Sequence, residues 1–266
     1  FIMGNLNDFD EATNNINKND LVEIDKWIIS EAIKPHEEIQ ELNDNYAYHH
    51  VIQKIHNFCV HELGGVYLDI IKDRMYVTKS NSNARRSAQF ALFEVADILI
   101  RLISPVLVFT AEEIWQSHEL FKKQSVSIFM APQKTLSEIE SSISDEDWKK
   151  IFAVKDAVNQ SIEKARADSV IKGSLDSKII ISCDKKTYKA LEKIEDELKF
   201  VFISSEVEIA ESSSSKLDIE VTNFDQKKCI RCWNKCSSVG LYEEDPEICS
   251  RCYTNVYGDG EIRKFV

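Results

Sequence analysis

Apolar residues recur every three to four positions through most of residues 20–120, which is the spacing of amphipathic helices. The first helix is predicted to begin at Asp20, which together with Glu23 has the form of a capping box, and to run towards Leu42. Pro35 lies inside this stretch and is expected to kink or split the helix, because proline lacks a backbone N–H and clashes with the preceding turn.

Three more helical patterns follow along the chain. The second covers Tyr48–Ile71 and contains Gly64-Gly65, which costs about 1 kcal/mol of helix propensity per glycine. The third covers Ala84–Ile103, and the fourth runs from Val106 to about Leu120. Long amphipathic helices with short connections predict an antiparallel helix bundle over residues 20–135.

The pattern changes after residue 136. Helices are predicted for Asp147–Ala167 and Lys185–Leu198, and Ser212–Ser215 indicates a hairpin or loop tip. Three short runs rich in β-branched residues indicate strands, namely Lys178–Ser182, Phe200–Ser204 and Leu217–Val221. Residues 136–224 are therefore expected to form a small α+β subdomain, in a fold that is mainly α and ends in a separate cysteine module.

Composition excludes several classes of protein. Hydrophobic residues make up 43% and charged residues 29% of the 266 residues, as in ordinary globular proteins. The longest apolar stretch, Ala91–Phe109, is interrupted by three charged residues, so no membrane partner is expected. The chain begins at Phe1 without a signal-peptide pattern, and we expect a piece of a longer cytoplasmic polypeptide.

Charge is spread unevenly along the chain. The net charge of −12 argues against binding nucleic acid over the whole surface. Residues 72–101 nevertheless carry six Lys and Arg against three Asp and Glu, whereas residues 1–69 are strongly acidic. A local basic segment can bind a polyanion, or it can be an ordinary solvated helix face.

Five of the seven cysteines fall between residues 229 and 252. Cys229 and Cys232 form one C-x-x-C pair, and Cys249 and Cys252 form a second pair after 16 intervening residues. Two such turns complete a tetrahedron of thiolates for one Zn²⁺, and four sulfur ligands leave no position for a reactive water, so a structural zinc site is predicted within residues 225–266. Cys236 fits neither pair and is interpreted as a bystander.

Several of these segments match a known family. The strongest local match is Tyr67-Leu-Asp-Ile-Ile-Lys-Asp-Arg74 with the following Ala84-Arg-Arg86, and Pro105–Trp115 is similar to a shared anticodon-binding helix. The cysteine tail continues into Gly258–Phe265. Together these residues resemble the C-terminal part of bacterial-type isoleucyl-tRNA synthetases, a family of class I aminoacyl-tRNA synthetases, and the resemblance extends over essentially the whole chain.

The resemblance implies a division of labour within a longer enzyme. Residues 1–19 resemble the segment that leaves the catalytic domain. Neither a HIGH-like motif nor a KMSKS loop occurs in the chain, so ATP and Mg²⁺ belong to an absent catalytic domain and this segment is expected to be inactive alone. The implied partners are the anticodon stem-loop of tRNA(Ile) and the catalytic and editing domains of the same polypeptide, which is expected to be a monomer.

Candidate tRNA contacts follow from the chemistry of single-stranded RNA, whose bases stack on aromatic rings while Lys and Arg hold its phosphates. Eight residues are proposed on this basis: Lys72, Arg74, Arg85, Arg86, Arg231, Trp233, Arg263 and Lys264. Ion-paired surface roles remain an even alternative for the basic residues. Trp233 either stacks on a nucleotide or, as we favour, covers the zinc knuckle, and Arg101 is expected to pair with Glu94 or Asp97.

Two other functions remain open on the sequence alone. A stand-alone zinc-ribbon adaptor would use the helix bundle as a scaffold for binding another protein. A sulfur-based redox protein would use Cys232 or Cys236 as a reactive thiol. Metal content and RNA binding distinguish these functions from tRNA recognition.

Overall fold

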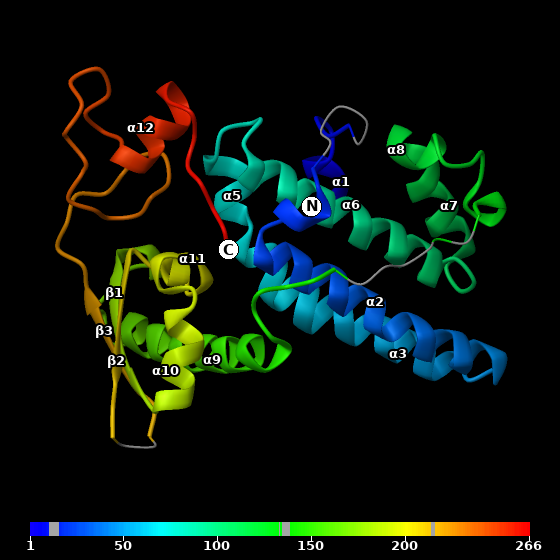
Figure 1. Cartoon of the computed structure of the whole chain (residues 1–266), viewed down its shortest axis with the longest axis horizontal. Helices are drawn as coiled ribbons and strands as arrows, with labels where there is room; N and C mark the ends of the chain where they lie inside the picture. The colour runs from blue at the N-terminus through cyan, green and yellow to red at the C-terminus, as the bar shows by residue number, and fades with distance from the viewer. Residues whose placement is uncertain (11–15, 133, 135–138, 214–215) are drawn as a thin grey trace. The chain divides into compact units, whose positions relative to one another are not determined.

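The computed structural model describes residues 1–10, 16–132, 134, 139–213 and 216–266. The chain forms two compact units, one of residues 1–75 and 83–141, the other of residues 76–82 and 142–266. The first unit is helical, and the second combines a three-stranded sheet with helices (Figure 1). The second unit also contains a cluster of four cysteines. The predicted fold class is confirmed.

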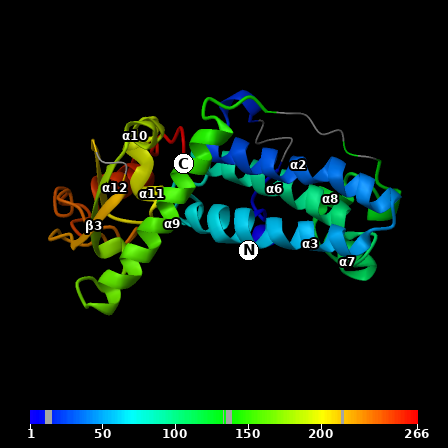
Figure 2. The ribbon, with the colours of Figure 1, turned by 90° about the horizontal axis from the view of Figure 1, so that it is seen from below.

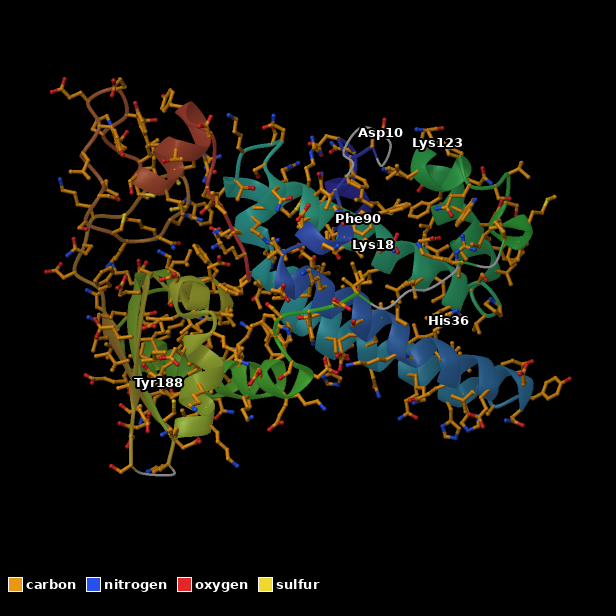
Figure 3. The ribbon with its side chains drawn as sticks, in the orientation of Figure 1. Asp10, Lys18, His36, Phe90, Lys123 and Tyr188 are labelled. Carbon is orange, nitrogen blue, oxygen red and sulfur yellow. The ribbon has the colours of Figure 1, made fainter. Side chains whose placement is uncertain are left out.

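Three long helices form the body of the first unit. They are α2 (Glu23–Asp44), α3 (Tyr48–Phe58) and α6 (Asn83–Ile103), and they run side by side in both views (Figures 1 and 2). Shorter elements complete the unit: α1 (Ile2–Asn5), η1 (Lys18–Asp20), η2 (Cys59–Tyr67), α4 (Leu68–Ile70), most of α5 (Lys72–Val77), α7 (Val108–Ser117), α8 (Glu119–Lys122) and η3 (Ile128–Met130). Figure 3 places the labelled His36 within α2 and Lys123 directly after α8.

The start and the middle of α2 differ from expectation. Asp20 ends the 3₁₀ turn η1, and α2 begins at Glu23, so the predicted capping box does not form. Pro35 lies inside an unbroken α2, because buried residues on both sides, among them Ile28 and Ile39, hold the helix together through packing. The prediction that proline splits the helix is wrong.

The glycine pair of the second helical pattern has a specific cause. Residues 59–67 form the π-helical stretch η2, in which each turn is wider than in an α-helix. A Cβ atom on Gly64 would lie 2.9 Å from the carbonyl oxygen of Cys59, and one on Gly65 would lie 2.9 Å from that of Val60. These close approaches leave room for glycine alone without a shift of the backbone.

The fourth predicted helix is shorter than expected. α7 ends at Ser117, and His118 is extended (φ −133°, ψ 132°) and caps the short α8 instead. Trp115 is fully buried, donates from its Nε1 atom to the carbonyl oxygen of Ser125 at 2.9 Å, and stands 5.5 Å from the Phe121 ring. Trp115 is therefore a packing residue, as predicted.

The sheet of the second unit is centred on β1 (Ser177–Cys183). β2 (Glu206–Glu211) pairs with it in parallel and β3 (Asp218–Asn223) pairs with it in antiparallel, giving the order β2-β1-β3. The parallel pair is joined by a helical crossover made of α10 (Lys185–Glu192), η5 (Glu195–Glu197) and α11 (Leu198–Val201). α9 (Asp145–Ala167) contacts β3 and α10, and α10 contacts β2, so these two helices cover one face of the sheet.

One predicted strand is wrong. Phe200–Ser204 lies in α11 and the turn after it, where Val201 and Phe202 are fully buried, because the helical crossover needs apolar side chains to pack against the sheet. The strand begins only at Glu206, in a run that alternates charged and apolar residues. The segment around Ser212–Ser215 joins two strands that are not neighbours, which excludes a simple hairpin, and its residues 214–215 lie outside the described residues.

The remaining elements of the second unit are η4 (Ser174–Asp176) and α12 (Ser250–Tyr257). Of the helices in the described part of the chain, none combines the length and the apolar character that crossing a membrane requires.

Candidate metal centre

The first cysteine pair lies on a tight backbone knuckle. Lys228 and Lys235 form an antiparallel bridge, and inside it the N–H of Cys229 donates to the carbonyl oxygen of Asn234 at 2.9 Å. The N–H of Trp233 donates to the carbonyl oxygen of Cys229 at 3.0 Å. These bonds close the loop around Cys229 and Cys232, whose side chains are buried on its inner side.

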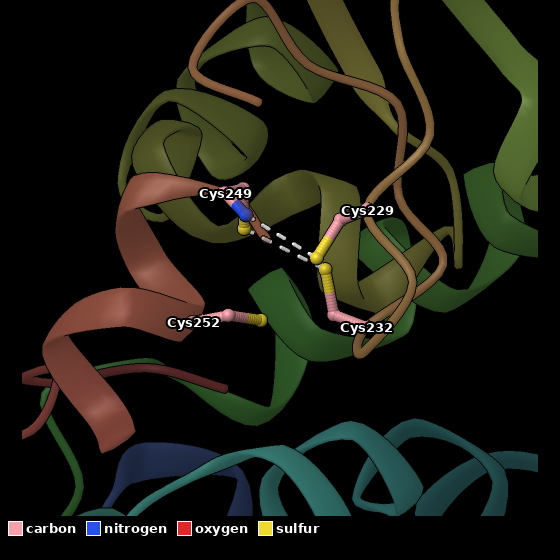
Figure 4. A group of neighbouring side chains, drawn as sticks. All are labelled: Cys229, Cys232, Cys249 and Cys252. Atoms are coloured by element: carbon pink, nitrogen blue, oxygen red, sulfur yellow. Dashed lines mark hydrogen bonds between the residues drawn. The ribbon is translucent and has the colours of Figure 1, made fainter. Parts of the chain in front are cut away.

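The second pair lies at the beginning of α12. Cys249 is the residue that precedes the helix and Cys252 lies in its first turn, so both point the same way. The four thiol sulfur atoms lie within 4.8 Å of one another and converge from the knuckle and from α12 (Figure 4). The N–H of Cys249 also donates to the Sγ atom of Cys229 at 3.3 Å, which ties the two pairs together (Figure 4).

This geometry fits a tetrahedral divalent ion. A Zn–S bond of about 2.3 Å implies sulfur atoms about 3.8 Å apart in a regular tetrahedron. The Sγ atoms of Cys232 and Cys249 are 3.8 Å apart, far beyond the length of about 2.05 Å for a disulfide bond. All four cysteines are at most 6% exposed, and a metal held by four sulfurs has no site left for substrate.

The thiols share their protons unequally. Hydrogen bonds from Cys249 and Cys252, and then the charge of Arg251, hold the pKa of Cys232 far below its usual range. The hydrogen bond between Cys249 and Cys232 raises the pKa of Cys249 to about 12. The pKa of Cys252 is also raised, mainly by its hydrogen bond to Cys232. Because a metal ligand must be a thiolate, loading the site must release protons.

A small apolar core surrounds the cysteines. Val77, Val239 and Ile248 are buried against them, with Cys236 and Tyr253 half-buried at the margin. Cys236 contacts the hydroxyl of Ser238 at 3.2 Å and is not part of the group of four. Apolar packing around the thiolates keeps water away from the site.

The sequence did not suggest that Val77, the last residue of α5, packs against the cysteines. The segment Tyr76–Ser82 belongs to the second unit, and its backbone and side chains are held there. Arg231 donates to the carbonyl oxygen of Val77, and the Nζ atom of Lys79 donates to that of Gly258 at 2.7 Å. The cysteine module is therefore completed by seven residues that lie about 150 positions earlier in the chain.

The arginines predicted to contact RNA from the helical unit have internal partners. Arg74 is 1% exposed, and its two terminal nitrogens donate to Asp25 at 2.8 and 2.5 Å. The hydroxyls of Tyr67 and Ser87 donate to the same carboxylate. Arg74 therefore anchors the helix packing, and we correct its assignment as an RNA contact.

Arg85 and Arg86 both hold the N-terminal segment. Arg85 contacts the carboxylate of Asp8 at 3.1 Å, and Arg86 donates to the carbonyl oxygen of Asp8 at 2.9 Å. Burial raises the pKa of Asp8, but hydrogen bonds from Gln89 and Arg85 and the charges of both arginines outweigh it and lower the pKa. Lys72 is exposed and pairs with Asp69 at 2.8 Å.

Of the RNA contacts predicted near the C-terminus, Trp233 and Lys264 are exposed and Arg263 is buried. Trp233 is 63% exposed and lies outside the apolar core around the cysteines, so the prediction that it covers the knuckle is wrong. Its φ angle of 65° is in the left-handed region, which bulky residues rarely adopt. Arg263 is 4% exposed and donates to Glu261, whereas the side chain of Lys264 is exposed.

Arg101 behaves as predicted. Its Nε atom donates to the buried carboxylate of Asp97 at 2.9 Å, and its guanidinium carbon lies 5.3 Å from the centre of the Trp115 ring. Arg101 therefore belongs to the packing of α6 against α7.

Family models match two parts of the chain. Residues 25–181 match the anticodon-binding domain of tRNA ligase, and residues 226–255 match the zinc finger found in FPG and IleRS. The second match spans all four cysteines of the metal centre, and the first begins in α2 and ends in β1.

Curated relatives match the whole chain. It is 40% identical over 279 residues to an isoleucine–tRNA ligase of Alcanivorax borkumensis and 39% identical over 279 residues to one of Shewanella putrefaciens. An isoleucine–tRNA ligase of Pseudoalteromonas translucida is 39% identical over 277 residues. In each case the match covers 100% of this chain but only 29–30% of the relative, so the chain spans less than a third of the length of these proteins. The chain belongs to the family of anticodon-binding domains of tRNA ligases, and its residues 226–255 are similar to the zinc finger found in FPG and IleRS.

Proposed function

We propose that this chain is the tRNA-recognition part of an isoleucine–tRNA ligase and binds the anticodon stem-loop of tRNA(Ile). The observation that carries the proposal is the family match over residues 25–181, which belongs to an anticodon-binding domain. The relatives that match the whole chain are named isoleucine–tRNA ligases, which sets the expected tRNA. The remaining part of the longer polypeptide would attach isoleucine with ATP and Mg²⁺.

Cys229, Cys232, Cys249 and Cys252 would hold one Zn²⁺. When bound, the ion cross-links the knuckle to α12 and supplies no reactive ligand, because all its positions are taken by sulfur. The chain's own residues then do the rest of the work: Val77 and Ile248 pack around the cysteines, and Arg251 offsets the negative charge of the thiolates.

Trp233 is the residue we assign to stacking on an unpaired base. A bulky side chain in the left-handed region costs about 1–3 kcal/mol, a strain that is found mostly at functional sites. The same knuckle that carries Cys229 and Cys232 holds this ring in solvent, 63% exposed. Stacking on an aromatic ring suits every base and is worth about 1–3 kcal/mol per base.

Phosphate contacts are assigned to cations whose side chains reach solvent. Lys72 and Lys264 are exposed, and Arg231 is half-buried beside Trp233. Arg85 and Arg86 direct their hydrogen bonds at Asp8, so we assign them to positioning the N-terminal segment.

Filter binding tests the proposal with tRNA(Ile) and with the same tRNA carrying a substituted anticodon. Tighter binding of the matched tRNA, weakened by salt, is expected because phosphate contacts release counterions. Equal binding of both tRNAs, or no binding, would contradict the proposal and favour a protein-binding adaptor. Rapid alkylation of the four cysteines in the metal-loaded chain would favour a redox protein instead.

A further inference from the structure

A groove of about 680 Å³ lies in the second unit, and its lining includes Arg251 of α12 but none of the four cysteines. Its walls come from Lys193 directly after α10, from η5 and α11, from α12, and from the segment of residues 261–265. In Figure 1 this last segment runs from α12 back towards α11. Segments about 60 residues apart in sequence therefore form one concave surface.

The floor of the groove is a fixed stack of charged and aromatic groups. The guanidinium carbon of Arg263 lies 3.2 Å from the centre of the Phe200 ring, and that of Arg251 lies 5.1 Å from it. Glu261 joins the two arginines, with contacts of 3.3 Å to Arg251 and 3.1 Å to Arg263. Arg263 also donates from its Nη1 atom to the carbonyl oxygen of Val266 at 3.1 Å, so acceptors of the same unit hold both guanidinium groups in place.

In one wall of the groove, the carboxylate of Glu197 binds backbone N–H groups. Glu197 is 8% exposed and accepts hydrogen bonds from the backbone N–H groups of Lys264, Phe265 and Val266 at 2.9, 3.0 and 2.6 Å. These bonds hold residues 264–266 in place and point the side chain of Lys264 outward. The acceptor sites of Glu197 are therefore engaged inside the protein.

Lysines line the rim. The Nζ atom of Lys199 lies 5.3 Å from the centre of the Phe200 ring, and neither Lys199 nor Lys264 forms an ion pair with another residue in the described ranges. Lys193 is paired with Asp147 at 2.6 Å. In a chain of net charge −12, the groove lining gathers five Lys and Arg against three Asp and Glu.

We propose that this groove binds the phosphate backbone of RNA, with Lys199 and Lys264 as the direct contacts and Arg263 and Phe200 as their rigid support. The inference rests on the proposed function, since it names a second surface for the same RNA. Lysine ammonium groups hold phosphates as point charges, and Ile262, 83% exposed at the rim, offers an apolar surface to a ribose or base. The fixed floor means that binding orders few side chains, which favours affinity.

The test uses the 266-residue chain and a hairpin RNA with the sequence of the tRNA(Ile) anticodon stem-loop. The double variant Lys199→Gln/Lys264→Gln is compared with Lys185→Gln, which removes an exposed lysine from the opposite end of α10. Loss of two single-strand phosphate contacts is expected to weaken binding about 10-fold or more at 0.1 M salt. It should also reduce the slope of log affinity against log salt by about 1.4. Lys185→Gln should change neither quantity.

Chemical acetylation of lysines gives a second readout that does not depend on variants. Bound hairpin RNA is expected to protect Lys199 and Lys264, and to leave Lys185 fully reactive. If the double variant binds the hairpin with unchanged affinity and salt slope, and the RNA does not protect Lys199 and Lys264, the groove is not an RNA-binding site. The proposed function would be unaffected by that result. Absence of any hairpin binding would defeat both, and displacement of the RNA by poly-glutamate of equal charge would assign the groove to an acidic peptide instead.

Discussion

The basic residues of the two units differ in whether a carboxylate pairs with them. In the helical unit the arginines of the basic segment face carboxylates of the same unit: Arg74 faces Asp25, Arg85 and Arg86 face Asp8, and Arg101 faces Asp97. In the second unit, the groove beside α12 keeps two lysines without a carboxylate partner among the described residues. A dense run of cations in the sequence therefore does not identify a nucleic-acid surface, because internal partners decide how much charge reaches solvent.

The two units are also held together by different interactions. The helical unit uses a buried ion pair and long apolar helices, whereas the cysteine module of the second unit places a group of four thiols at the centre of a small core of its own. A core this small supplies little hydrophobic stabilisation, so the metal must supply much of it.

Metal removal should have the largest effect, because it should destabilise the cysteine module and leave the helical unit unchanged. Structural zinc sites contribute about 10–16 kcal/mol in isolated zinc-finger peptides. A strong chelator is therefore expected to expose the backbone of residues 225–266, and of Tyr76–Ser82, whose Val77 packs on the cysteines. Hydrogen exchange followed by mass spectrometry measures this, with the α2–α3 helices as the internal control. Unchanged protection of both segments after complete metal removal would show that the apolar core suffices alone.

Breaking the buried ion pair should be the next largest effect. Asp25→Asn leaves Arg74 buried without a counter-charge, which costs about 3–5 kcal/mol. Denaturant unfolding monitored by helical circular dichroism measures the loss. The matched control is Asp69→Asn, which breaks the exposed pair with Lys72 and should cost less than about 1 kcal/mol. Similar losses in the two variants would refute the structural role assigned to Arg74.

Replacing Trp233 should affect the stability of the second unit and its affinity for RNA in opposite directions. Trp233→Gly relieves the left-handed backbone strain, so the second unit should be as stable as before or more stable by about 1 kcal/mol. Affinity for the anticodon hairpin should fall about 10-fold, since one stacked base is worth about 1–3 kcal/mol. Thermal unfolding and filter binding on the same preparation test both halves. A variant that is less stable, with unchanged RNA affinity, would return Trp233 to a packing role.

The smallest effect is expected at Asp8. Its pKa is lowered in the folded chain, so the stability that it contributes is present above the ordinary aspartate pKa and is lost as pH falls through the lower, folded value. Asp8→Asn should therefore flatten the dependence of unfolding free energy on pH below about 4, by well under about 1 kcal/mol because the group is partly exposed. Acid titrations of the two proteins that superimpose would mean that Arg85 and Arg86 do not depend on this carboxylate.

Local patterns predicted the local features well. The spacing of Cys229, Cys232, Cys249 and Cys252 matches a group of four convergent thiols, and the helical periodicity of residues 84–103 matches α6 almost residue for residue. Both signals lie within short windows of sequence, where one periodicity or spacing decides the outcome.

Features that depend on distant partners were missed. The carboxylate that pairs with the buried Arg74 is 49 residues away in the sequence. Val77 packs against cysteines that lie more than 150 residues further along the chain, so no local pattern predicts either contact. Phe200–Ser204 has strand-like composition but packs as part of a helical crossover. The strained backbone of Trp233 is imposed by the knuckle hydrogen bonds, which spacing alone does not reveal.

The most direct test is whether the chain prefers a hairpin with the isoleucine anticodon, measured with and without the metal. The ratio of affinities for the matched hairpin and an anticodon-substituted hairpin is measured on the zinc-loaded chain and again after chelation. We predict a clear preference for the matched hairpin in the loaded chain and its loss after chelation, because Trp233 and the groove both depend on the module that the cysteines hold together. The same preference in the metal-free chain would contradict the account.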